Sequence, residues 1–112
     1  MHELSVTQNI VAIVSEAAKG RRVTRVTLEV GKLSGVMADA IAFCFDVVAQ
    51  GTVLERASLE ILEIDGLGRC EACGLEFEAE TLFAPCPCGS IRWKRVRGEE
   101  LIVKSVEMVE AA

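Results

Sequence analysis

Apolar residues near the start of the chain repeat at the spacing of an amphipathic helix. We predict a helix over residues 5–19, SVTQNIVAIVSEAAK, with its start at residue 5 or two to three residues earlier. Its apolar face would be formed by Val6, Ile10, Ile13, Val14 and Ala17. Ser5 followed by Gln8 is typical of a capping box, and Gly20 is typical of a helix end.

The pattern then changes from helical to alternating. In VTRVTLEVG, residues 23–31, Val26, Leu28 and Val30 alternate with Arg25, Thr27 and Glu29, which predicts a strand with one wet face. Residues 36–50, VMADAIAFCFDVVAQ, predict a second and more deeply buried helix. Residues 57–64 and 100–110 have strand composition, and we expect them to be neighbours in one sheet. The fold class is therefore α+β, with two helices packed on a small three-stranded sheet.

Between the last two strands the composition changes to glycine, cysteine and alternating charge. This stretch begins at residue 66 and ends at residue 97, and both its ends return to the main sheet. We interpret it as an inserted module, which divides the chain into a domain formed by 1–65 plus 98–112 and a domain formed by 66–97.

Size and charge exclude several classes of function. At 112 residues the chain buries only about two-thirds of its unfolded surface, so a metal ion would stabilise it. No apolar run approaches the roughly 18 residues that a membrane span requires. The net charge of −5 argues against general nucleic-acid binding, which needs excess cationic side chains. Five cysteines without a secretory signal suggest a cytoplasmic protein that binds metal through thiolates.

The inserted module carries two closely spaced cysteine pairs. Cys70 and Cys73 form a C-x-x-C knuckle followed by Gly74, and Cys86 and Cys88 form a second pair twelve residues later with a single residue between them. Four thiolates complete the tetrahedral sphere of a structural Zn²⁺ and leave no open position for catalysis. We predict a zinc ribbon that folds around this ion, with tighter geometry at the second pair.

The fifth cysteine, Cys44, lies in the second predicted helix and is interpreted as a buried free thiol without reactivity.

The charged residues of the module could bind a partner or could neutralise one another. Glutamates 76, 78 and 80 precede a basic run of Arg92, Lys94, Arg95 and Arg97, with Trp93 between the first two cations. Pairing of the two segments in a hairpin would neutralise the charges across strands. We favour that interpretation over a phosphate-binding face.

The only histidine of the chain is His2. With one imidazole and no nucleophile near it, catalytic pairs are lacking and an enzyme is not expected. The Met1 amine, the peptide nitrogen of His2 and its imidazole can instead chelate one ion, because they form small fused rings. Such a nitrogen set suits Ni²⁺ or Cu²⁺, and an open terminus suits an ion that is handed on.

Several short motifs occur in order along nearly the whole chain. They are MHELS at the start, GKLSG after the first strand, AFCFD in the second helix, CEACG with CPCGS, and GEELIVKSVE near the end. Together they resemble the hydrogenase maturation factor HypA/HybF family. Two departures stand out: the second cysteine pair is one residue shorter than is usual there, and Ala38 lies where a proline is common.

The resemblance implies a nickel metallochaperone for [NiFe] hydrogenase. It implies Ni(II) as transient cargo on His2, Zn(II) on Cys70, Cys73, Cys86 and Cys88, and the GTPase HypB and the hydrogenase large subunit as partners. A partner that exchanges nickel must reach His2, so the first predicted helix is the expected docking platform.

Two other functions remain open. The first alternative is a zinc-ribbon module that acts on nucleic acid or transcription machinery. The second is a hydrolytic zinc enzyme, which would lack an open metal position and a general base.

Overall fold

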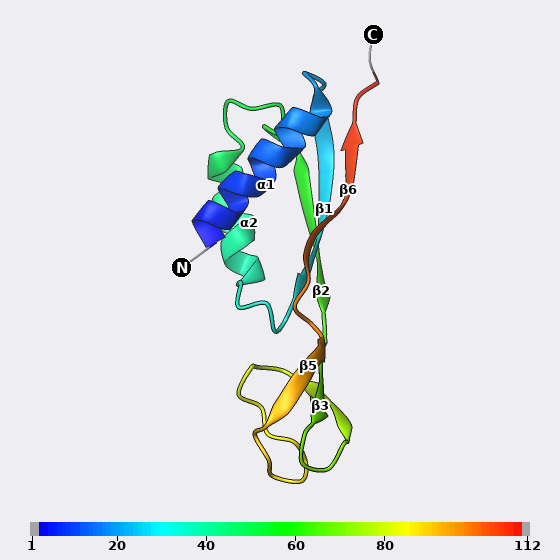
Figure 1. Cartoon of the computed structure of the whole chain (residues 1–112). Helices are drawn as coiled ribbons and strands as arrows, with labels where there is room; N and C mark the ends of the chain where they lie inside the picture. The colour runs from blue at the N-terminus through cyan, green and yellow to red at the C-terminus, as the bar shows by residue number, and fades with distance from the viewer. Residues whose placement is uncertain (1–2, 111–112) are drawn as a thin grey trace.

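The computed structural model describes residues 3–110, which form two sheets that follow one another along the molecule (Figure 1). The extents of 58 × 25 × 17 Å make it elongated. We call residues 3–65 and 98–110 the body, and residues 66–97 the ribbon. The helices lie on one side of the body sheet, as predicted for an α+β fold (Figure 1).

The body sheet is built around its first strand. Strand β1 (Val23–Gly31) lies between β2 (Ser58–Ile64), which is parallel to it, and β6 (Leu101–Met108), which is antiparallel. All three strands were expected in one sheet, but the prediction that β2 and β6 are neighbours is wrong. The central place goes to β1 because it carries the most apolar inner face, with Val26, Leu28 and Val30 all buried.

The first helix, α1 (Glu3–Ala18), begins two residues before the predicted start, so Ser5 lies inside it and is not the cap. Its buried residues are Glu3, Thr7, Ile10, Val11, Val14 and Ala18. The predicted apolar face was therefore rotated, and Ile13 and Ala17 are exposed. The pattern missed Thr7, whose hydroxyl donates to the Glu3 carbonyl at 2.6 Å and so enters the core already paired.

The second helix, α2 (Ala38–Val48), buries only Ile41 and Phe45 along its length. The expectation that it would be the more deeply buried helix is wrong, because Phe43 and Val47 point to solvent. Within residues 3–110, neither helix has the length and apolar character needed to cross a membrane.

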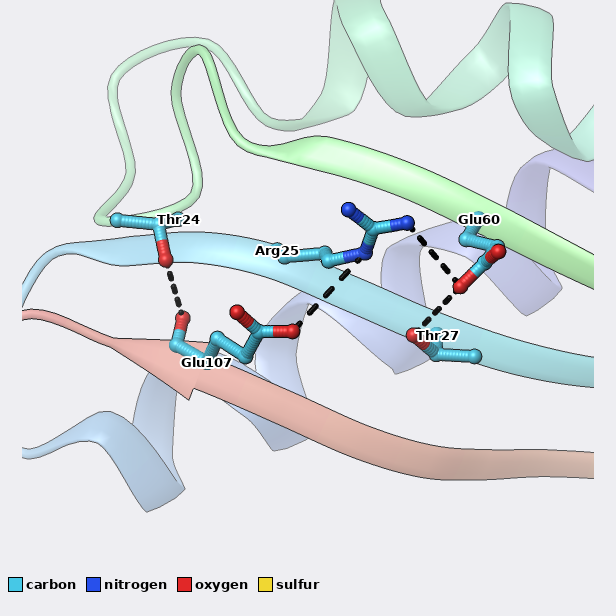
Figure 2. Close-up of polar contacts among 5 residues, drawn as sticks. All are labelled: Thr24, Arg25, Thr27, Glu60 and Glu107. Carbon is cyan, nitrogen blue, oxygen red and sulfur yellow. Dashed lines mark hydrogen bonds and ion pairs between the residues drawn. The ribbon is translucent and has the colours of Figure 1, made fainter.

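The sheet face opposite the helices is polar and tied across its three strands (Figure 2). The Arg25 guanidinium on β1 lies 3.2 Å from Glu60 on β2 and 4.0 Å from Glu107 on β6. Thr27 donates to the same Glu60 carboxylate, and Thr24 donates to the Glu107 carbonyl. The charged side chains are about half exposed, so their ion pairs contribute little to stability, whereas Thr27 is buried beneath them.

In the ribbon, β3 (Gly66–Cys70) is the central strand between β4 (Glu76–Ala79) and β5 (Trp93–Arg97), and both pairings are antiparallel. The predicted charge pairing between the acidic and basic segments is therefore wrong, since β3 separates them. Arg69 on β3 pairs with Glu76, while Arg95 pairs with Glu99. After the second cysteine pair, β5 pairs with the edge of β3 opposite β4. Both cysteine pairs therefore lie at the same end of β3.

Body and ribbon meet at a crossing of three chain segments. Leu33, in the turn after β1, is fully buried in the ribbon core with Cys70, Phe77, Ala79 and Cys86. A Cβ on Gly66 would lie 2.7 Å from the Leu33 side chain and 2.3 Å from the Ala79 carbonyl oxygen. A Cβ on Gly98, whose φ is +113°, would lie 2.7 Å from the Gly66 Cα. Only glycine fits at either position.

Hydrogen bonds reinforce this crossing. The Leu33 amide donates to the Gly98 carbonyl at 2.7 Å, and the Lys32 amide donates to the Ile64 carbonyl at 2.9 Å. The Lys32 ammonium lies 2.9 Å from Asp65, at the β2–β3 connection, and 3.5 Å from Glu80 of the ribbon. The hydrogen bond to Asp65 raises the pKa of Lys32 and lowers that of Asp65. The GKLSG turn thus connects the body to the ribbon.

Replacing Leu33 by alanine should loosen this junction. The lost side chain leaves a cavity between the sheets, and we expect the free energy of unfolding to fall by about 3 kcal/mol. Urea unfolding at a fixed zinc concentration measures the change. Leu75→Ala is the matched control, because Leu75 is an exposed ribbon leucine and its loss should cost no more than about 0.5 kcal/mol. Equal effects of the two substitutions would contradict this account of the junction.

Candidate metal centre

Four cysteine sulfurs meet at the end of the ribbon away from the body. Cys70 ends β3 and Cys73 follows in the next turn, while Cys86 and Cys88 lie in the turn before β5. All four Sγ atoms lie within 4.8 Å of one another. Cys70 and Cys88 are 3.7 Å apart, and Cys73 and Cys86 are 3.6 Å apart. The structure brings together all four cysteines that the sequence nominated.

The first pair is held by a backbone turn that points amide groups at sulfur. The amides of Ala72 and Cys73 donate to Cys70 Sγ at 3.3 and 3.4 Å. The Gly74 amide donates to the Cys70 carbonyl, and the Cys70 amide donates to the Leu75 carbonyl. Gly74 has a φ of +79°, which turns the chain back at little cost because it has no side chain.

The second pair repeats this arrangement with one residue fewer. The Cys88 amide donates to Cys86 Sγ at 3.5 Å, and the Gly89 amide donates to the Cys86 carbonyl at 2.8 Å. The Cys86 amide donates to the Ser90 carbonyl, which closes the turn. Gly89, with a φ of +95°, is the counterpart of Gly74. The shorter C-x-C spacing is therefore compatible with the same kind of knuckle and with convergent sulfurs.

The sulfur positions fit a tetrahedral metal ion. Zn–S bonds of about 2.3 Å in a tetrahedron place neighbouring sulfurs about 3.8 Å apart. The two short separations lie close to that value, and each pair contributes one buried sulfur ligand, Cys70 or Cys86, and one exposed one, Cys73 or Cys88. The four-cysteine cluster is thus suited to a structural metal ion.

The thiols differ in how readily they ionise. The hydrogen bond from the Cys73 amide, with that from Ala72, lowers the pKa of the Cys70 thiol to about 6. Burial raises the pKa of the Cys86 thiol to about 12. Cys70 can offer a thiolate at neutral pH, whereas the Cys86 thiol loses its proton to solvent only when a metal cation binds the sulfur. Metal binding here displaces protons, so it weakens as pH falls.

Aromatic packing supports the cluster from the ribbon interior. Phe77 and Trp93 meet edge to face, with ring centroids 5.3 Å apart. The Trp93 indole donates to the Ala84 carbonyl at 2.8 Å, which anchors the loop that carries the second cysteine pair. The ring lies against Gly68, where any Cβ would meet it at 2.4 Å. The fifth cysteine, Cys44, is half-buried on α2 and takes no part in the cluster.

The predicted nickel residue, His2, lies outside the described residues, as does Met1. The next residue, Glu3, is buried at the start of α1. Its carboxylate accepts a hydrogen bond from the Met37 amide at 2.9 Å. This contact ties the beginning of α1 to the segment before α2. Sequence reasoning missed it, because a glutamate in the first turn of a helix usually faces solvent.

Within residues 3–110, an α+β body joined to a four-cysteine ribbon is typical of a small protein with a structural metal centre. Comparison with known proteins names the family. The family model described as hydrogenase/urease nickel incorporation, metallochaperone, hypA matches residues 1–108. Hydrogenase maturation factor HypA of Nostoc punctiforme is 59% identical over 110 residues, covering 98% of this chain and 97% of the relative. The corresponding protein of Geobacter metallireducens is 50% identical over 109 residues, covering 96% and 99%.

A solved structure agrees with the fold. The solution structure of the Ni metallochaperone HypA from Helicobacter pylori matches with a TM-score of 0.66 at 23% identity, covering 99% of this chain and all of that one. The chain belongs to the HypA family of nickel metallochaperones for hydrogenase maturation. Members of this family act in nickel incorporation as metallochaperones.

Removing one sulfur should disrupt the ribbon. In Cys73→Ala three thiolates remain, and because metal binding and local folding are one equilibrium, the ribbon should become protease-sensitive while the body core persists. Elemental analysis and limited proteolysis check both statements. Cys44→Ala is the control and should keep the full metal content. Undiminished zinc stoichiometry in Cys73→Ala would overturn the assignment of this cluster.

Proposed function

We propose that this chain carries one Ni²⁺ at its amino terminus through His2 and delivers it to [NiFe] hydrogenase. The family match, which extends over residues 1–108, is the observation that carries the proposal. It is supported by the chemistry of the terminus, since the Met1 amine, the His2 peptide nitrogen and the imidazole form a chelate suited to Ni²⁺. The ion is bound at the surface and can be transferred directly to a partner.

A hollow near the beginning of α1 is rich in carboxylates. Next to Glu3, the Met37 amide belongs to the rim of a shallow hollow of about 300 Å³ between body and ribbon. Three carboxylates, those of Asp39, Glu63 and Glu80, and the single cation of Lys32 line this hollow. Excess negative charge raises the local concentration of cations at this end of the body.

We assign Zn²⁺ as the resident ion of Cys70, Cys73, Cys86 and Cys88. Four thiolates favour zinc, and a filled coordination sphere gives the ion a structural role in the ribbon. Separate sheets and separate apolar cores support a division into a nickel-binding domain of residues 1–65 plus 98–112 and an inserted zinc ribbon of residues 66–97.

The proposed partners are the GTPase HypB and the hydrogenase large subunit, in the cytoplasm. Nickel transfer requires ligand sets at contact distance, so each partner must reach His2. The alternative of a nucleic-acid-binding ribbon is disfavoured by the net charge of −5 and by the family assignment.

The proposal predicts that nickel binding depends on the imidazole at position 2. His2→Gln should lose nickel while it retains zinc, with a stability change of no more than about 0.5 kcal/mol, because the residues that form the two apolar cores lie further along the chain. In the wild-type chain, binding should weaken as pH falls through roughly 6.5, where protons compete for imidazole. Calorimetric titration with Ni²⁺ of the zinc-loaded protein measures both effects.

Two controls locate the site. Adding Gln8→His to the His2→Gln variant returns an imidazole to an exposed position on α1, away from the terminal amine, and should not restore nickel binding. A long amino-terminal tag should weaken binding because it removes the free amine. Full-strength nickel binding by His2→Gln would refute the proposed site.

A further inference from the structure

Helix α2 carries apolar side chains on the face that points away from the core. Phe43 is 77% exposed and Val47, one turn later, is 59% exposed, while Ile41 and Phe45 are buried on the opposite side. Met37, just before the helix, is 66% exposed. A helix that is apolar on both faces is normally covered on both, and clustered exposed apolar groups mark interaction sites. We call Met37, Phe43 and Val47 the α2 outer face.

Acidic residues border this face. Asp39 and Asp46 lie two turns apart on α2, both are exposed, and neither carboxylate forms an ion pair with any residue between 3 and 110. A second copy of the chain docked face to face would bring four such carboxylates together. The charges therefore disfavour self-association here and favour a partner whose apolar contact surface is bordered by lysine or arginine.

Met37, the first residue of the outer face, is held at the beginning of α1. The Glu3 carboxylate binds the Met37 amide at 2.9 Å, and Glu3 directly follows His2 in the chain. A protein seated on the α2 outer face would therefore also meet the segment that binds Glu3, the residue that follows His2 in the sequence. The exposed side of α1 offers less, because its large exposed apolar residues, Leu4 and Ile13, are nine positions apart.

We propose that the α2 outer face is the docking surface for the protein that exchanges nickel with this chain. That partner presents apolar side chains flanked by cations, which contact Phe43 and Val47 and pair with Asp39 and Asp46. The inference rests on the proposed function, and it places docking on α2 where the sequence alone favoured α1.

The test uses the full-length, zinc-loaded chain and purified GTPase HypB as the probe, with affinity measured by calorimetry. Phe43→Ser combined with Val47→Ser should weaken binding at least about tenfold, since buried aromatic contacts dominate interface energy. Ile13→Ser, which removes an equally exposed apolar group from α1, should leave the affinity unchanged. Circular dichroism and zinc content verify that each variant is folded.

A second pair of variants tests the charges. Asp46→Lys should weaken binding to the same GTPase by a similar factor, and raised salt should weaken binding of the wild-type chain. Glu16→Lys, an equivalent reversal on α1, should have little effect. Unchanged affinity in both α2 variants, or a loss confined to the α1 variants, would overturn the proposal.

Further outcomes separate this inference from the proposed function. The α2 variants should bind Ni²⁺ as the wild-type chain does, and His2→Gln should still bind the GTPase. Nickel binding that survives in His2→Gln refutes the proposed nickel site alone. A wild-type chain that does not bind the GTPase, or α2 variants that lose only a self-associated form in analytical ultracentrifugation, refutes the docking surface.

Discussion

The arrangement of this molecule depends on the close crossing of body and ribbon around Leu33. Three glycines at this crossing, Gly31, Gly66 and Gly98, leave no room for a Cβ, and at Gly31 the Gly98 carbonyl oxygen would lie 1.9 Å from one. The Leu33 side chain joins the ribbon core while its neighbours belong to the end of β1. The chain enters the ribbon from β2 and leaves it toward β6. This crossing therefore fixes where the four-cysteine cluster lies relative to the helices.

The proposed function assigns two metal ions of different chemistry to this chain. A sphere of four thiolates leaves no open position on the ion, which suits an ion that stays. The proposed terminal nitrogen chelate requires no folded pocket, which suits an ion that leaves. The contact of Glu3 with the Met37 amide ties the beginning of α1 to the segment before the proposed docking surface on α2.

Much of the fold and the cysteine cluster could be predicted from the sequence, because local patterns determine them. Alternation in β1 indicated the core strand, and the spacing of the cysteines indicated the four residues that converge. The errors involve long-range order. Neither the position of β1 between β2 and β6 nor that of β3 between β4 and β5 is encoded in a local pattern. An apolar leucine inside the polar GKLSG turn was a signal for the junction, whereas nothing local indicated that Phe43 would face solvent.

The central claim is that nickel and zinc occupy separate sites on one chain, and native mass spectrometry tests it most directly. Zinc-loaded protein titrated with Ni²⁺ should gain one nickel per chain without loss of zinc, and a mild chelator should then remove nickel alone. Chemical acetylation of the terminal amine should abolish only the nickel adduct. Nickel that displaces zinc, or that binds the acetylated chain as strongly as before, would contradict the account.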